Sequence, residues 1–122
     1  MEMDDAKFRA IVADAIDQIP PQFAKLLENV VFLVVDEPSA EQLADADGED
    51  LLGVYEGLAI NDGDFFRVGV GEPNRIFIFK EPTLRMYNTE AEVAEEVLVT
   101  VFHEVAHHIG VSEDTLFELG WA

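Results

Sequence analysis

The segment TEAEVAEEVLVTVFHEVAHHIG, from Thr89 to Gly110, constrains the fold of this chain more than any other stretch. Its apolar residues recur at spacings of three and four, the pattern of a helix with one buried face. Thr89 and Glu92 match the capping box that starts a helix, and Gly110 suits the left-handed position just past a helix end. We therefore predict a long helix that begins at Asn88 or Thr89 and ends before Gly110. Its predicted core stripe comprises Leu98, Phe102, Val105 and Ile109.

The rest of the chain alternates helical and strand-like segments. An amphipathic pattern from Phe8 to Ile19 predicts a first helix, which Pro20 and Pro21 end. Shorter helices are predicted at residues 22–29 and, after a capping Ser112, at 113–119. Apolar or alternating segments bounded by Gly, Asn and Asp predict strands at residues 30–35, 51–60, 64–71 and 75–82. These elements predict one domain over residues 1–122 with a small sheet of three or four strands.

The composition argues against several classes of function. The chain has 26 acidic residues against 7 Lys and Arg, a net charge of −19, and the basic residues form no run, whereas nucleic-acid binding needs clustered basic residues. The longest apolar stretch, VVFLVV, is far shorter than the roughly 20 residues of a membrane span. The absence of Cys excludes thiolate metal ligands. The first residues, MEMDDAKF, lack the features of a signal peptide, so we expect a cytoplasmic protein with neither a nucleic-acid nor a membrane partner.

An acid-rich segment, AEQLADADGED, covers residues 40–50. Ser39 and Gln42 match a capping pattern and predict a helical turn at its start. The repeated Asp residues suggest a calcium loop as one interpretation, but they lack the ligand spacing and the final Glu of an EF-hand. We expect an exposed acidic loop there instead.

All three histidines of the chain lie within the predicted long helix. His103 and His107 are four residues apart, so they share one helix face and can bind one cation. With Glu104 they form the motif H-E-x-x-H, in which two neutral imidazoles bind zinc and the Glu acts as general base toward the water that the metal activates. The composition gives an expectation of about 0.01 such matches by chance.

The alternative is an ordinary helix whose histidines occupy its polar face. Val93, Val97 and Thr100 lead up to the two histidines on a half-apolar side of the helix, which favours a walled cleft. The third histidine, His108, points about 100° away from the pair. We therefore expect His108 beside the ligands or in solvent, and not on the metal.

A zinc site that keeps an open position for water needs a third protein ligand. Glu113 follows His107 by six residues, and Gly110 lets the chain reverse between them. We predict Glu113 as this ligand, with Asp114 and then Glu118 as alternatives. Acidic residues in the first turn of a helix also complement its dipole, which would explain Glu113 and Asp114 without a metal.

Three stretches, FHEVAHHIGVSEDTLFELGW, LLGVYEG and RIFIFKEP, resemble the small bacterial family of zincin-like metallopeptidases called minimal zincins. The resemblance covers nearly the whole chain from the first helix onward. It implies an α+β fold, zincin-like and minimal, in which a small, mostly antiparallel sheet packs against the active-site helix. It also implies that His103 and His107 bind zinc, that Glu104 is the catalytic base, and that an acid after Gly110, usually Asp and here Glu113, is the third ligand. No Met follows the motif, so the chain departs from the metzincins.

Together these features predict a metallopeptidase with one catalytic Zn²⁺ that hydrolyses a peptide or protein substrate. By the resemblance, RIFIFKEP is the strand expected to align the substrate, and Tyr55, Tyr87 and Arg85 are candidates to stabilise an oxyanion. One alternative is a non-catalytic metal-binding or protein-interaction module on the same frame. Another is an acidic cation buffer in which HEVAH is incidental. The sequence leaves the oligomeric state open.

Overall fold

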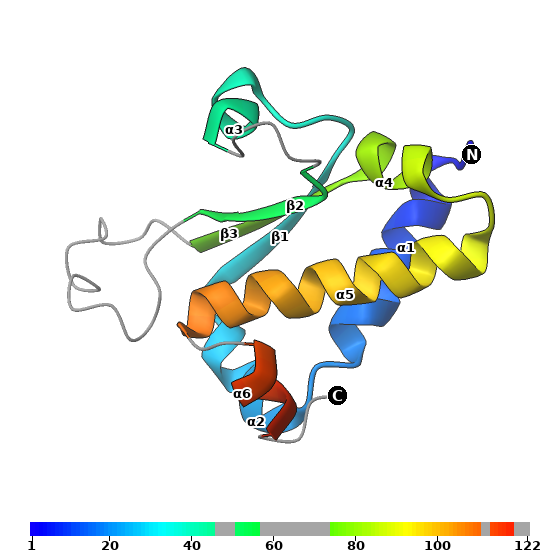
Figure 1. Cartoon of the computed structure of the whole chain (residues 1–122). Helices are drawn as coiled ribbons and strands as arrows, with labels where there is room; N and C mark the ends of the chain where they lie inside the picture. Colours follow the sequence, from blue (N-terminus) through cyan, green and yellow to red (C-terminus); the bar gives the residue numbers. More distant parts are fainter. Residues whose placement is uncertain (46–50, 57–73, 111–112, 119–122) are drawn as a thin grey trace.

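The computed structural model describes residues 1–45, 51–56, 74–110 and 113–118 of the chain, and at residues 45, 113, 116 and 117 it describes the backbone alone. In chain order, its elements are α1 (Asp5–Asp17), α2 (Pro21–Ala24), the 3₁₀ helix η1 (Lys25–Leu27), β1 (Val30–Val35), α3 (Ala40–Asp45), β2 (Gly53–Glu56), β3 (Asn74–Phe79), α4 (Lys80–Met86), α5 (Glu90–Ile109) and α6 (Glu113–Glu118). Helices α1 and α5 lie on one side of the sheet and α3 lies on the other (Figure 1). The predicted α+β class is confirmed.

In the described part of the chain, the sheet has three strands in the order β1-β3-β2. β3 pairs in parallel with β1 and antiparallel with β2, and the parallel pairing is the longer of the two. The predicted mostly antiparallel sheet is therefore wrong, because the sheet is mixed. The cause is that β1 and β2 are joined through α3 and not by a tight turn, and β3 inserts between them. The strand predicted at residues 64–71 lies outside the described residues.

The core lies between the sheet and the two longer helices. Ile76 and Ile78 of β3 are fully buried there, as is Phe8 of α1. A buried stripe of α5 repeats every four residues and comprises Val93, Val97, Val101, Val105 and Ile109, so Val105 and Ile109 of the predicted stripe are confirmed. Leu98 and Phe102, which the predicted stripe included, are only partly buried at its margin. The first half of the stripe is thus rotated from its predicted position, and the side of α5 that carries the motif faces the sheet.

Both ends of α5 lie where the sequence predicts them. The Thr89 side chain accepts a hydrogen bond from the Glu92 N–H at 3.2 Å, and the Thr89 hydroxyl donates to the Glu92 carboxylate at 3.0 Å. Gly110 adopts the left-handed conformation with φ 81° and donates its N–H to Ala106 O at 2.8 Å. The predicted pairing of Thr89 with Glu92 is confirmed, although the backbone N–H that reaches the Glu92 carboxylate is that of Asn88, at 3.4 Å. The C-terminal glycine is also confirmed, so both ends of the helix are fixed by local contacts.

Helix α4 takes the place of the last residues of the strand predicted over residues 75–82. The strand ends at Phe79 and the chain continues directly into α4. Pro82 lies in the first turn of this helix, where a missing N–H costs nothing. The first residue of α4, Lys80, is buried, and its ammonium donates to Asp5 of α1 at 2.6 Å.

Of the remaining local predictions, some are confirmed and one concerns residues that the structure does not describe. The strand at Val30–Val35 is confirmed, and Ser39 and Gln42 exchange the predicted reciprocal hydrogen bonds at 2.8 and 3.1 Å at the start of α3. The acidic loop over residues 46–50 lies outside the described residues. No described helix has the combination of length and apolar character that would let it cross a membrane.

Candidate metal centre

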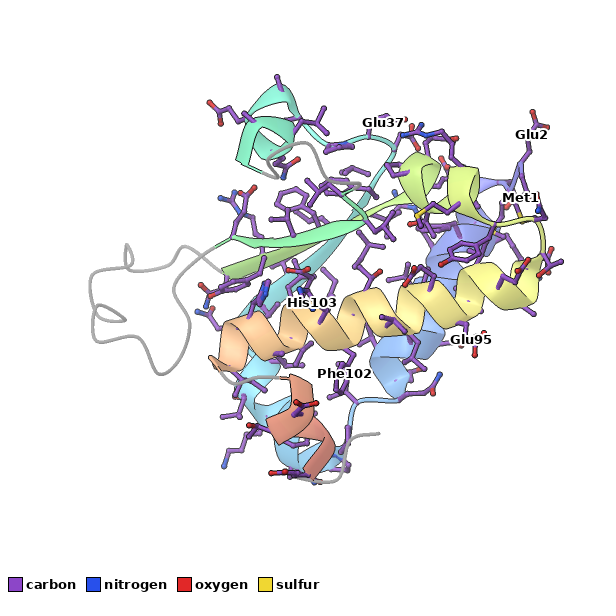
Figure 2. The ribbon with its side chains drawn as sticks, viewed as in Figure 1. Met1, Glu2, Glu37, Glu95, Phe102 and His103 are labelled. Atoms are coloured by element: carbon purple, nitrogen blue, oxygen red, sulfur yellow. The ribbon has the colours of Figure 1, made fainter. Side chains whose placement is uncertain are left out.

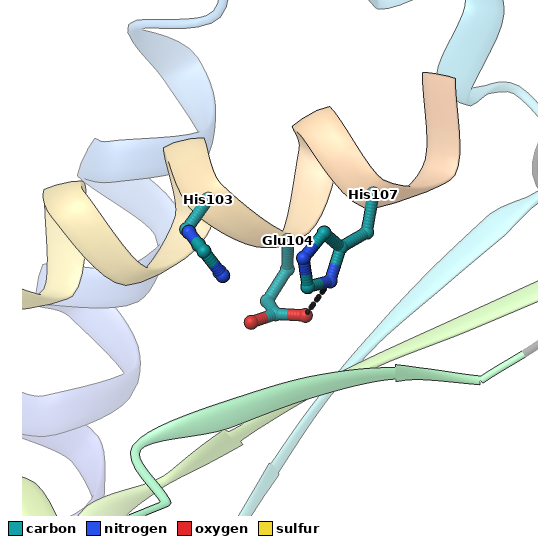
Figure 3. Close-up of side chains that lie close together, drawn as sticks. All are labelled: His103, Glu104 and His107. Carbon is teal, nitrogen blue, oxygen red and sulfur yellow. Dashed lines mark hydrogen bonds and ion pairs between the residues drawn. The ribbon is translucent and has the colours of Figure 1, made fainter. Parts of the chain in front are cut away.

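Three potential metal ligands converge on the side of α5 that faces β2 (Figure 3). One donor atom from each of His103, Glu104 and His107 lies within 4.8 Å of the other two. The imidazole rings of His103 and His107 are 4.4 Å apart between centroids and meet at 65°. Figure 2 places His103 on the sheet side of α5 and Phe102 on the opposite side. The helical spacing in the sequence therefore brings the motif side chains together as predicted.

Glu104 is the buried member of this group. Its exposed fraction is 5%, and its carboxylate accepts hydrogen bonds from His107 Nδ1 at 3.1 Å and from the backbone N–H of Tyr55. Burial raises the pKa of the Glu104 carboxyl, while the two neighbouring histidines and these hydrogen bonds lower it, and the effect of burial is the larger. Because Nδ1 of His107 donates to a carboxylate, a neutral His107 carries its lone pair on Nε2, where a cation can bind.

The two histidines are exposed and line a cleft of about 320 Å³. The walls of this cleft come from α5 and from the chain at and just before β2: Leu51, Leu52, Gly53, Val54, Val99, Thr100, His103, Glu104 and His107. Two accessible imidazoles and one carboxylate in an otherwise apolar cleft are a donor set that suits zinc. The predicted walled cleft, rather than a plain polar helix face, is what the described residues form.

Gly53 allows β2 to approach α5 this closely. A Cβ atom at this position would lie 2.6 Å from Cγ2 of Thr100 and 2.9 Å from the carbonyl oxygen of Phe77. No side chain fits between the strand and the helix without displacing one of them. Our prediction assigned no role to Gly53, although a glycine within a strand-like segment is a signal of such a close approach.

His108 is not in the ligand group, as expected from its direction on the helix. It is buried, with Nε2 3.0 Å from Leu26 O and Nδ1 3.3 Å from the Tyr55 hydroxyl. Burial lowers the pKa of His108, which favours the neutral ring. Of the two positions that the sequence left open, the one in solvent is therefore wrong. His108 lies beside the site and is connected to Glu104 through Tyr55.

The predicted third ligand lies at the start of α6. Glu113 is the first residue of this helix, and its side chain lies outside the described residues. The alternatives Asp114 and Glu118 are described, exposed, and not members of the ligand group that the described residues form. Glu113 as ligand thus stays a prediction.

Two of the three oxyanion candidates have partners elsewhere. The Tyr87 hydroxyl donates to Glu96 at 2.7 Å, and Arg85 donates to Glu37 at 2.6 Å. Tyr55 reaches the site, but through its backbone N–H and not its hydroxyl. The partners of the Tyr55 and Tyr87 hydroxyls and of the Arg85 guanidinium described above are therefore not His103, Glu104 or His107.

The strand predicted to align a substrate is also corrected. β3, which contains RIFIF, is the central strand, and both of its edges pair with neighbouring strands. It therefore has no edge left for a substrate strand. The strand that lines the cleft is β2.

Comparisons with known proteins concern the family and the fold of the chain. The sequence profile of the zincin-like metallopeptidases matches residues 27–121. Among solved structures, a conserved hypothetical protein from T. thermophilus is similar with a TM-score of 0.58 and 19% identity, over 92% of this chain and 95% of that one. At this identity the likeness concerns the fold alone. No curated protein sequence matches the chain significantly.

Proposed function

Because the chain belongs to the family of zincin-like metallopeptidases, whose profile spans residues 27–121, we propose that it is a zinc-dependent peptidase acting on a peptide or protein substrate. The family resemblance read from the sequence is thereby confirmed. The observation that carries the proposal is the convergence of His103, Glu104 and His107 within 4.8 Å in a cleft of about 320 Å³. The net charge of −19 favours neither a nucleic-acid nor a membrane partner.

In this proposal His103 and His107 hold one zinc ion, and Glu113 supplies the third ligand. When bound, zinc acts as a Lewis acid on the scissile carbonyl and lowers the pKa of water toward about 7. The lone pair on Nε2 of His107 is available for this role because Nδ1 donates to Glu104. Gly110 ends α5 in the left-handed conformation and Glu113 is the first residue of α6, which supports Glu113 as the ligand that follows His107.

Glu104 acts as the general base. It takes a proton from the attacking water and gives it to the leaving amine. Its raised pKa, caused by burial, brings the carboxyl closer to the operating pH of such a reaction. The hydrogen bonds from His107 and from the Tyr55 N–H restrict the rotation of the carboxylate, which keeps the base oriented before the substrate arrives.

The first test is metal content. After zinc loading at neutral pH and removal of loose metal, we expect about one zinc per chain in the parent and none in His103→Ala. The third ligand is tested by Glu113→Gln against Asp114→Asn, a matched pair of adjacent acidic residues. We expect zinc affinity to fall roughly 10- to 100-fold or more in Glu113→Gln and to stay unchanged in Asp114→Asn. A loss of zinc affinity in Asp114→Asn, with no loss in Glu113→Gln, would show that Asp114 is the third ligand.

The second test is turnover. The zinc-loaded parent is incubated with a mixed peptide library, and new termini are identified by mass spectrometry. We expect Glu104→Gln to retain zinc and to lose at least about 100-fold in cleavage rate, because it can no longer accept the proton. Stoichiometric zinc without cleavage in the parent would support the non-catalytic module instead. A folded parent that retains no zinc would contradict both and favour an incidental motif.

A further inference from the structure

Behind the ligand group, polar side chains from α5, β2 and β3 form a buried cluster. His108 is 1% exposed and Asn74 is 2% exposed. His108 Nε2 lies 3.0 Å from Leu26 O, a group that only accepts, so this nitrogen carries the proton. His108 Nδ1 lies 3.3 Å from the Tyr55 hydroxyl, which lies 3.2 Å from Asn74 Oδ1. The hydroxyl has one proton, which it can donate to either of these two acceptors but not to both at once. Three elements, β2, α5 and β3, therefore meet at Tyr55, and His108 links them to η1.

Tyr55 connects this cluster to the site. Its backbone N–H donates to the Glu104 carboxylate, and its ring meets the His108 ring edge-on, with centroids 5.4 Å apart at 63°. Glu104 and His108 are four residues apart on α5, so both face the same strand. β2 contains only four residues, Gly53–Glu56, and the anchored Tyr55 side chain fixes its position along the helix. That position decides whether the N–H meets the carboxylate.

We propose that His108 positions Glu104 for catalysis by anchoring the side chain of Tyr55, so that the Tyr55 N–H holds the carboxylate in one orientation. This inference rests on the proposed peptidase function, since its kinetic effect requires turnover. His108 touches neither substrate nor metal in this scheme and is a positioning residue. Its loss leaves the zinc ligands in place and lowers kcat, because the base spends less time in the orientation that accepts the proton.

A purely structural role of His108 predicts a different result, and the chain offers a matched control. Thr83 of α4 is 1% exposed, and its hydroxyl donates to Phe79 O at 2.8 Å. It is not among the described residues that line the cleft. Thr83→Val removes a buried hydrogen bond while keeping the side-chain volume, so it reproduces a loss of stability without touching Tyr55 or Glu104.

The first experiment is steady-state kinetics of the zinc-loaded full chain on a peptide selected from the library. We expect His108→Phe to keep its zinc and a KM within about twofold of the parent, and to lose roughly 10- to 100-fold in kcat. Tyr55→Phe removes the hydroxyl that both His108 and Asn74 contact, so we expect it to lose at least as much in kcat as His108→Phe. The double variant is no worse than Tyr55→Phe, because the contact between the two residues is already broken. Thr83→Val keeps the parent kcat. The proposal is overturned if His108→Phe has the kcat of the parent, or if Thr83→Val loses as much kcat as His108→Phe. If His108→Phe fails to fold, an unchanged kcat in Tyr55→Phe overturns the proposal instead.

The second experiment does not depend on turnover. Hydrogen exchange of the Tyr55 amide is followed by NMR in the zinc-free chain, with the Phe79 amide, which donates to Leu52 O at 2.9 Å, as a reporter of general opening between β2 and β3. We expect His108→Phe to raise the Tyr55 exchange rate at least about tenfold relative to Phe79. An unchanged ratio overturns the proposal. If the parent cleaves no peptide, the proposed function fails, and this ratio still decides whether His108 holds Tyr55 against Glu104.

Discussion

Nδ1 of His107 lies 3.1 Å from Oε1 of Glu104, so a hydrogen bond links a potential metal ligand to the potential base of the same motif without any cation. The pair is unequal, because the His107 side chain is 53% exposed and that of Glu104 only 6%. The imidazole can meet a cation from the cleft, while the carboxylate is held within the protein. Burying that carboxylate has a cost, since desolvation outweighs the favourable neighbours and raises its pKa.

This cost predicts that Glu104→Gln stabilises the metal-free protein at neutral pH. In the unfolded chain the carboxyl titrates near 4.5 and in the folded chain at a higher value. As pH rises through this interval the unfolded state loses its proton first, so the parent loses stability and the variant does not. Urea unfolding with chelator, from about pH 4 to about pH 8, should show the difference growing in favour of Glu104→Gln and then levelling. A difference independent of pH would contradict the prediction.

A second prediction concerns the contact between β2 and α5. Gly53→Ala places a Cβ 2.6 Å from Cγ2 of Thr100 and 2.9 Å from Phe77 O, so we expect a loss of about 1–3 kcal/mol in the free energy of unfolding. Adding Thr100→Ser removes the nearer atom and should restore part of this loss, because the backbone contact remains. Thr100→Ser alone is the control, since it keeps the hydroxyl that bonds to Glu96 O. Full stability of Gly53→Ala in urea would show that the strand can move away freely.

The sequence predicted well whatever depends on neighbours within one helix. The ends of α5 follow from Thr89 and Gly110, and the meeting of His103 with His107 follows from their four-residue spacing. It predicted poorly whatever depends on distant segments. The parallel pairing of β1 with β3 places Val30 opposite Asn74, and no local pattern specifies a partner so far along the chain.

The same limit applies to the surroundings of the motif. Helical geometry gave the direction of His108 away from the metal ligands, but not its burial, because its partners Leu26 and Tyr55 belong to η1 and β2. Which residues of α5 are buried likewise depends on the side of the helix against which the sheet packs, and helical spacing alone does not specify that side. The strand predicted over residues 75–82 overlaps the first turn of α4, where a proline such as Pro82 is tolerated.

A third prediction concerns the end of α5, immediately after the motif. Gly110 has φ 81° and its N–H caps Ala106 O at 2.8 Å. Gly110→Ala forces a side chain into the left-handed region and should cost about 1–2 kcal/mol in the free energy of unfolding. Gly110→Asn should cost less, because Asn tolerates this conformation better. Urea unfolding of the two variants separates them, and equal stability of both with the parent would mean that the turn can adopt another conformation.

The last prediction concerns the buried Lys80 and its carboxylate partner Asp5. Lys80 is 7% exposed, and its ammonium lies 2.6 Å from Asp5 Oδ1. The hydrogen bond with Lys80 is the first cause that lowers the pKa of Asp5 below 3.8, and the same bond raises the pKa of Lys80 above 10.5. The stability from Asp5 is therefore present above about pH 3.8 and lost as pH falls through the lowered value. The stability from Lys80 is present below about pH 10.5 and lost as pH rises through the raised value.

Asp5→Asn should accordingly destabilise the protein at neutral pH and not at strongly acidic pH, where Asp5 of the parent is protonated too. Glu90→Gln is the matched control, because Glu90 is also the first residue of its helix and pairs with Lys7 at 3.2 Å, but with both side chains at least half exposed. Both changes remove a favourable negative charge from a helix N-terminus. The exposed ion pair of Glu90 with Lys7 adds little further to the free energy of unfolding. We expect a larger loss for Asp5→Asn in urea unfolding at neutral pH, because it leaves the ammonium of Lys80 buried without its partner. Equal losses in the two variants would show that the Lys80 ammonium reaches solvent when Asp5 is replaced.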